Sequence, residues 1–218
     1  MARRFRVPDF ARAALVAGLA FWPLIAAAQD VPAIPEQVLT NDPSHTTVDF
    51  GLSHLGFSTY RGSFGDVAIK LTLDTAHPEA AKLDAVVGID SLIVPNPPAG
   101  FLDTLLGPDW FDAAKYPEAH FVSDSITLTG PTTADIHGTL TLHGVTRTFM
   151  LKATFNGGYA EHPLEPRPRL GFAATGSFKR SDFDMGFFVP PAGETFGIGD
   201  AVTLTIDVEM IGAMKAPN

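Results

Sequence analysis

Apolar residues recur at every second position from Thr46 onward, which is the period of a β-strand. In the first such stretch Val48, Phe50 and Leu52 share one face, and the same parity places His54 on that face. The alternation predicts eight strands, which cover residues 48–54, 67–73, 85–89, 121–128, 136–142, 145–155, 172–178 and 202–210. The fourth stretch is less regular than the others, and we expect a β-bulge in it.

The connections between these stretches are mostly short and rich in turn residues. Residues 101–106 are expected to form a helical turn, whereas residues 109–117 look irregular. Because few helical patterns separate the strands, a parallel β-α-β sheet is disfavoured. Eight antiparallel strands with one apolar face fit a closed barrel or a sandwich, so the predicted fold class is all-β.

One turn can be predicted in detail from the sequence LTLHGVTRTF. His143 and Gly144 form a two-residue hairpin loop, in which the glycine tolerates a positive φ. This register sets Gly138 opposite Phe149, and we expect the aromatic ring to lie over the glycine.

Two further connections are long. Residues 157–168 are polar and proline-rich, whereas residues 183–199 hold four phenylalanines, a methionine and several glycines. A loop as apolar as the second one either packs over the barrel or borders an opening for an apolar ligand. The sequence leaves both possibilities open.

The first 28 residues have the layout of a secretory signal peptide. Four arginines precede the apolar run Ala13–Ile25, and Ala26–Ala28 supply the small residues of a cleavage site before Gln29. The run is shorter than the roughly 20 residues that span a membrane. No other stretch is apolar for long enough to span one, so we expect an exported chain without a transmembrane span after cleavage.

The net charge and the absence of cysteine exclude several kinds of partner and site. Without residues 1–28, which hold four arginines and Asp9, the chain carries 11 basic and 23 acidic residues, a net charge of −12. Such a chain repels phosphate backbones, so nucleic acid is not an expected partner. The absence of cysteine excludes disulfides and thiolate metal sites.

His54 is the candidate for catalytic chemistry, because its parity points it inward. The surrounding stretch SHLGFSTYRGSF has no carboxylate to orient the ring, so catalysis would need Asp90 or Asp103 from elsewhere. The other interpretations of His54 are a polar contact to a ligand or water and a hydrogen-bonded structural histidine. The chain has no His-x-His pair, no HExxH or G-x-S-x-G motif and no glycine-rich phosphate loop before a helix. We therefore expect no metal site, no cofactor and no catalytic residue.

Five stretches, in this order, resemble the YceI-like family of exported lipid-binding proteins. They are residues 42–64, 86–92, 109–123, 138–155 and 171–186. The chain departs from the family pattern in two places. Residues 102–106 read LDTLL and lack the arginine and histidine often found there, and Asp184 stands where the family usually has glycine.

The resemblance implies an eight-stranded antiparallel lipocalin-like barrel with a short helical segment. It implies a periplasmic binding or carrier protein, not an enzyme, that holds a long apolar molecule such as a polyisoprenoid, an isoprenoid quinone or a fatty acid derivative. A homodimer is possible by the same resemblance. Two alternatives stay open: an enzyme that acts on a lipid or quinone in the same cavity, and an interaction module whose barrel is filled.

The expected layout is a signal peptide over residues 1–28, an N-terminal extension over 29–45, the YceI-like barrel over 46–213 and a tail over 214–218. Inward parity predicts the residues that line a ligand cavity: Phe50, Leu52, His54, Ile69, Leu71, Val87, Phe121, Leu140, Phe149, Leu151, Phe172, Ala174, Gly176, Phe178, Leu204 and Ile206. Small inward residues such as Ala85, Ala174 and Gly176 would leave room for a ligand. Arg61, Arg147 and Arg180 lie near predicted strand ends, where they either contact a polar head group or are solvated.

Overall fold

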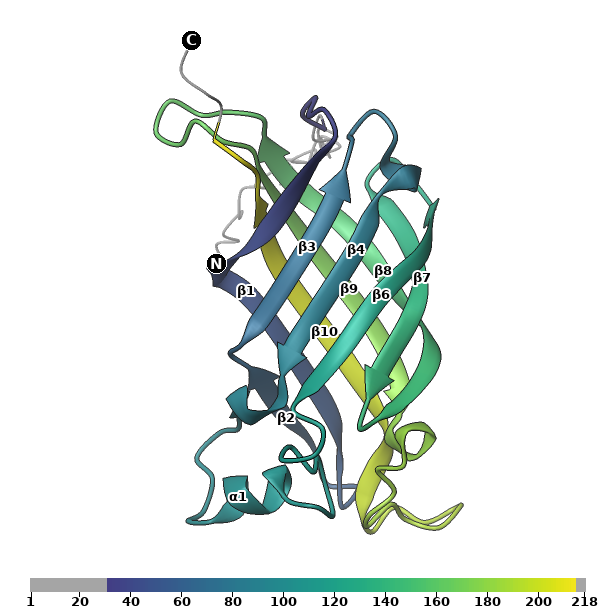
Figure 1. The fold of residues 1–218 in the computed structure, drawn as a ribbon. Coiled ribbons are helices and arrows are strands. Elements are labelled where there is room, and N and C mark those ends of the chain that lie inside the picture. The colour runs from purple at the N-terminus through teal and green to yellow at the C-terminus, as the bar shows by residue number, and fades with distance from the viewer. Residues whose placement is uncertain (1–30, 215–218) are drawn as a thin grey trace, which may run out of the picture.

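The computed structural model describes residues 31–214, in which long strands wrap into a barrel (Figure 1). The predicted signal peptide and residues 215–218 lie outside the described residues. The strands are β1 (Gln37–His54), β2 (Ser58–Phe64), β3 (Val67–Leu73), β4 (Lys82–Gly88), β5 (Leu92–Ile93), β6 (Glu118–Leu128), β7 (Thr133–Leu142), β8 (Val145–Tyr159), β9 (Arg169–Lys179) and β10 (Ile198–Ile211). The helical elements are α1 (Phe101–Leu106) and the 3-10 turns η1 (Pro78–Ala80), η2 (Ile89–Ser91) and η3 (Arg180–Phe183).

The barrel is closed by antiparallel pairing around its whole circumference. The order is β1, β3, β4, β6, β7, β8, β9 and β10, and β10 pairs back to β1. The predicted eight-stranded antiparallel barrel with one short helix is therefore confirmed. No helix within residues 31–214 is both long and apolar enough to cross a membrane.

We call the end with α1 and the β1–β2 turn the lower end, and the end with the β8–β9 loop the upper end, as in Figure 1. Strand β1 runs between the two ends. Its first residues pair with β3, and its last residues pair with β2. Strands β2 and β3 run in the same direction along β1, so together they act as one strand that is interrupted at Gly65 and Asp66.

Two sequence-based boundaries in this region are wrong. Strand β1 begins at Gln37 rather than near Thr46. The sequence pattern missed its first residues because a register shift between Asn41 and Thr46 breaks the apolar alternation there. Residues 58–64, which the apolar alternation left between the first two predicted strands, form strand β2. Its glycine and polar residues hide the strand period, although Tyr60 and Phe64 both point inward.

The β7–β8 hairpin has the predicted register. His143 has a φ of 51° and Gly144 a φ of 75°, as a two-residue turn of this type requires, and Gly138 pairs with Phe149. The prediction that the ring of Phe149 lies over Gly138 is wrong. A Cβ on Gly138 would lie 2.7 Å from the ring of Phe121, so the ring that covers this glycine comes from β6. The bulge predicted in β6 lies between Ser123 and Ser125.

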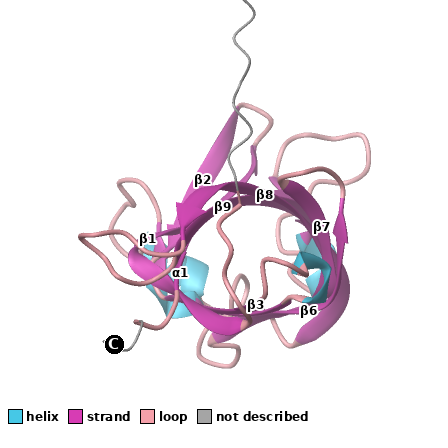
Figure 2. Cartoon of the chain, turned by 90° about the horizontal axis from the view of Figure 1, so that it is seen from above, coloured by secondary structure: helices cyan, strands magenta, loops and turns pink. Residues whose placement is uncertain are grey.

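A cluster of apolar side chains fills the upper end of the barrel. Leu39, Leu170 and Met210 are at most 1 % exposed, and Ile34 is nearly as deeply buried. The segment that leads into β1 crosses the barrel opening when the molecule is viewed from above (Figure 2). Hydrogen bonds join Ile34 and Thr75, which fix this segment to the end of β3. The barrel is thus closed at its upper end.

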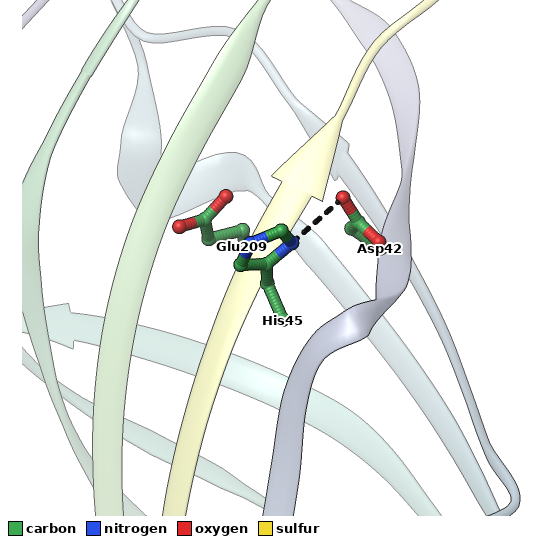
Figure 3. Close-up of side chains that lie close together, drawn as sticks. All are labelled: Asp42, His45 and Glu209. Carbon is green, nitrogen blue, oxygen red and sulfur yellow. Dashed lines mark hydrogen bonds and ion pairs between the residues drawn. The ribbon is translucent and has the colours of Figure 1, made fainter.

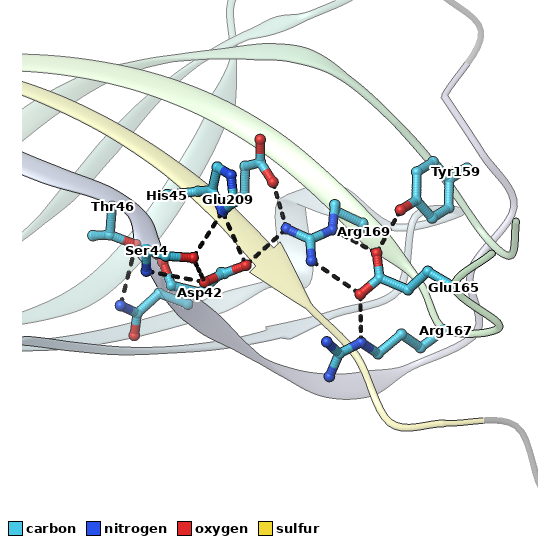
Figure 4. A network of polar contacts seen from close by, with 10 residues as sticks. Asp42, Ser44, His45, Thr46, Tyr159, Glu165, Arg167, Arg169 and Glu209 are labelled. Carbon is cyan, nitrogen blue, oxygen red and sulfur yellow. Dashed lines mark hydrogen bonds and ion pairs between the residues drawn. The ribbon is translucent and has the colours of Figure 1, made fainter.

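An ionic network around Arg169 joins the strands at the same end (Figure 4). Arg169 donates to Glu165 from Nε (2.8 Å) and Nη2 (2.9 Å), and from Nη1 to Asp42 (2.9 Å) and to Glu209. Tyr159 donates to Glu165 over 2.6 Å. Hydrogen bonds from Ser44 and then Arg169 hold the pKa of Asp42 well below its usual range, and Arg169 does the same for Glu165.

These depressed pKa values predict acid lability of the upper end. Both carboxyls stabilise the fold above their unfolded pKa values of about 4, and this stability is lost as the pH falls toward the lower folded values. Replacing Arg169 by Gln should lower the melting temperature at pH 7 and flatten its decline between pH 5 and pH 2. Thermal unfolding across this pH range checks the prediction.

The ion pair between the exposed Lys152 and the partly buried Asp135 offers a control, because Lys152→Gln removes a surface ion pair of small expected effect. Superimposable curves of melting temperature against pH for Arg169→Gln and the unmodified chain would contradict the role of the network.

Candidate functional site

An apolar cavity of about 290 Å³ occupies the barrel interior below the upper cluster. Along β1 its wall extends from Val48 to His54, which is about 20 Å of strand and, at the usual strand tilt, about 15 Å of the barrel axis. The wall consists almost entirely of aliphatic and aromatic side chains. An elongated apolar cavity suits a chain-like molecule better than a compact polar one.

Most residues predicted from strand parity lie in this wall. They are Phe50, Leu52, His54, Ile69, Val87, Phe121, Leu140, Phe149, Leu151, Phe178, Leu204 and Ile206. The alternation along each strand was sufficient to identify these residues, because one face of each barrel strand points inward.

Four of the predicted lining residues lie outside the wall. Leu71 and Phe172 pack against the upper cluster. Gly176 is covered, since a Cβ there would lie 2.5 Å from the ring of Phe149, and Ala174 is not among the wall residues either. Parity identifies the inward face of a strand but not the height at which the cavity ends.

The lower part of the wall comes from segments that the strand pattern did not include. The segment around α1 supplies Phe101, Leu105, Trp110 and Phe111, and β2 supplies Tyr60 and Phe64. The loop between η3 and β10 supplies Met185 and Phe188, with Ile198 at the start of β10. The four phenylalanines within residues 183–199 were the sequence signal for this contribution. The sequence left open whether residues 183–199 pack over the barrel or border an opening, and the structure shows both. Phe183 is buried, whereas Phe188 lies in the wall and is 49 % exposed.

The cavity reaches the surface at the lower end, since Phe188 is at once part of the wall and half exposed. His54 and Tyr60 lie near this mouth with ring centroids 6.1 Å apart. Burial raises the pKa of the Tyr60 hydroxyl. Asp90 and Asp103 are exposed and outside the wall, and no carboxylate belongs to it among the described residues. His54 therefore lacks the partner that general acid–base chemistry in this cavity would need.

Arg180 is buried beneath the mouth, with 4 % of its surface exposed, so it is not solvated, and it belongs to the cavity wall. Its guanidinium donates to four backbone carbonyl oxygens: Met185 (2.9 Å), Phe187 (2.7 Å), Ile198 (2.9 Å) and Gly199 (3.1 Å). It also lies over the ring of Trp110 at 5.4 Å. Burial lowers the pKa of the guanidinium, and Asp200 opposes this shift. One side chain thus fixes the loop that borders the mouth.

The other two candidate arginines do not contact the cavity. Arg61 is exposed on β2 and packs over the backbone of Gly51. Arg147 keeps inward parity but is exposed at the hairpin end, where it donates to the carbonyl oxygen of Thr146. Asp184, which stands at the family's glycine position, has a φ of 58°, a left-handed conformation that aspartate tolerates.

Asp42, His45 and Glu209 lie close enough together to resemble a metal site (Figure 3). His45 Nδ1 lies 3.1 Å from Asp42 Oδ2. However, Arg169 already bonds to both carboxylates, so a cation is present between them. The cluster is accounted for by the ionic network of the upper end.

Replacing Arg180 by Met would leave up to four carbonyl oxygens without a donor while retaining most of the side-chain volume. We expect a loss of about 2–4 kcal/mol of unfolding free energy, since each buried unpaired carbonyl is costly. We also expect faster amide exchange over residues 185–198. Denaturant unfolding and hydrogen–deuterium exchange measure these effects.

Lys179→Met is the matched control, because Lys179 is the exposed last residue of β9 and directly precedes Arg180 in the sequence. Equal stability and equal exchange in the two variants would show that Arg180 does not hold the loop.

Comparison with known proteins agrees with this architecture. The model of the YceI-like domain matches residues 39–210. A UPF0312 protein of Pseudomonas savastanoi pv. phaseolicola is 36 % identical over 210 residues, which cover 93 % of this chain and 96 % of that protein. The crystal structure of the Campylobacter jejuni YCEI protein is 28 % identical with a TM-score of 0.61, covering 74 % of this chain and 90 % of that one.

A polyisoprenoid binding domain from Saccharophagus degradans shares the fold at 12 % identity, with a TM-score of 0.54 and coverage of 81 % of this chain and 98 % of that one. The family model spans most of the described residues and includes nearly all of the closed barrel. The chain belongs to the YceI-like family.

Proposed function

We propose that this protein is a periplasmic carrier that binds a long apolar chain inside its barrel, such as that of a polyisoprenoid, an isoprenoid quinone or a fatty acid derivative. The observation that carries the proposal is the elongated apolar cavity, which is closed at its upper end and reaches the surface at its lower end. A filled interaction module would have no such cavity.

The energetics of burial favour such a ligand. Each methylene group transferred from water into an apolar site contributes about 0.8 kcal/mol, so a chain of several methylenes binds without any charged contact. The described wall contains one cation, Arg180, and its guanidinium is already engaged by backbone carbonyls. The site therefore favours a ligand whose buried part is uncharged.

Two further observations support the proposed apolar ligand and the proposed periplasmic location. The Saccharophagus degradans neighbour is by its name a polyisoprenoid binding domain, and it shares the barrel fold. The first 28 residues have the sequence pattern of an export signal.

Filling the cavity with a larger side chain should abolish retention of the cargo. Ala85 lies in the wall on β4, and Ala85→Phe places a ring in the space that a ligand chain would occupy. Native mass spectrometry of protein purified from its own periplasm should show an added apolar mass for the unmodified chain. The variant should show at least about tenfold lower occupancy at a destabilisation of about 1–3 kcal/mol.

The control is Ala68→Phe, which adds the same ring on the exposed outer face of neighbouring strand β3. Undiminished cargo in Ala85→Phe, or an equal loss in Ala68→Phe, would contradict binding inside the barrel. Thermal unfolding establishes that both variants are folded.

A further inference from the structure

Four phenylalanine side chains are exposed around the lower end of the barrel. Phe57 is 81 % exposed, Phe196 64 %, Phe187 50 % and Phe188 49 %. Phe57 lies in the β1–β2 turn, and the other three belong to the loop between η3 and β10, which lies at the foot of the molecule in Figure 1. We call these four residues the aromatic rim.

The aromatic rim is one patch, although its residues come from two separate segments. The backbone N–H of Leu55 donates to the carbonyl oxygen of Gly197 over 2.8 Å, which joins the turn to the loop. A Cβ on Gly56 would lie 2.9 Å from Thr195, next to Phe196 in the sequence. Within the loop, the ring centroids of Phe187 and Phe188 are 6.4 Å apart, as are those of Phe188 and Phe196.

The rim is held in its exposed position by hydrogen bonds. Arg180 accounts for the carbonyl oxygens of Phe187 and Ile198, and the N–H of Ile198 donates to the carbonyl oxygen of Phe188 over 2.8 Å. Exposed apolar patches that a fold holds in place, rather than allowing them to collapse, mark surfaces that meet an apolar partner.

The rim is continuous with the cavity. Phe188 belongs to both, and Trp110, which lies in the cavity wall, packs against Phe187 with a centroid distance of 5.4 Å. A molecule that leaves the cavity through the mouth therefore passes directly over the aromatic rim. The partner must offer an apolar phase at that point, because a long apolar chain gains nothing by entering water.

The charges around the rim specify the surface of that partner. Residues 184–197 contain Asp184 and Glu194 but no lysine or arginine, and residues 55–57 carry no charge. Anionic lipid surfaces attract basic clusters, and this patch has none. A bilayer with zwitterionic head groups accepts aromatic side chains at its interface without repelling the two carboxylates.

We propose that the aromatic rim docks on the surface of a zwitterionic phospholipid bilayer, with the mouth of the cavity facing the acyl chains. The proposal rests on the proposed carrier function and adds the route by which the cargo enters and leaves.

The test is flotation of the purified protein with vesicles of pure phosphatidylcholine, compared with vesicles that contain phosphatidylglycerol. The double variant Phe57→Ser/Phe196→Ser removes two rim side chains that are not part of the cavity wall. We expect it to bind phosphatidylcholine vesicles about tenfold to hundredfold more weakly than the unmodified protein. Phosphatidylglycerol should weaken the binding of the unmodified protein.

Leu164→Ser is the matched control. Leu164 is 90 % exposed in the β8–β9 loop at the opposite end of the barrel, so its replacement should leave vesicle binding unchanged. Trp110 is the one tryptophan within residues 31–214 and serves as a fluorescent probe of the lower end. If the lower end lies on the bilayer, brominated phosphatidylcholine should quench the Trp110 fluorescence of the unmodified protein. This quenching should be lost in the double variant.

Native mass spectrometry of the same samples separates the two proposals. Retained cargo without vesicle binding, or equal vesicle binding by the double variant, would overturn bilayer docking and leave the carrier function standing. Vesicle binding by a protein that never holds an apolar molecule would support docking and overturn the carrier function. A dimer in sedimentation velocity that the double variant converts to a monomer would show that the rim joins two copies of the chain, which also overturns docking.

Discussion

The pairing of β1 with β10 is the interaction on which the rest of the molecule depends. It joins the first and last strands of the sheet and so removes both edges that an open sheet would expose. The ladder runs from Thr40 and Ile211 at the upper end to His54 and Ile198 at the lower end. Without it the inward faces of the strands would not enclose a volume, and neither the upper cluster nor the cavity would exist.

The two ends of the barrel are stabilised by different kinds of interaction. At the upper end a dry apolar cluster and the network around Arg169 join β1, the β8–β9 loop, β9 and β10. At the lower end the backbone of a loop is held by Arg180, whose partners are carbonyl dipoles rather than carboxylates. The ionic end is sensitive to the protonation of acids, whereas the dipolar end keeps its donor at every physiological pH.

Much of the fold could be predicted from the sequence, because a two-residue period directly reports which face of a strand is buried. The period predicted the eight barrel strands, and the turn chemistry of His143 and Gly144 predicted a hairpin register. The period failed where polar residues and glycine interrupt it, so β2 and the first residues of β1 were missed. The site was predictable only in part. The height of Leu71 in the barrel and the burial of Arg180 depend on contacts between segments that are distant in the sequence.

The closed upper end gives the barrel a direction. A chain can enter a blind tunnel only with one end first, and the end that leads must be the one without polar groups, since the far wall offers none. For the proposed cargo, the distance from the mouth to the upper cluster would limit the length of chain that the barrel encloses. A chain that is too short leaves an empty space at the far end, and a chain that is too long leaves its remainder outside the barrel. For a ligand of the proposed kind, the cluster around Leu39, Leu170 and Met210 would therefore set the chain length that fits inside the barrel.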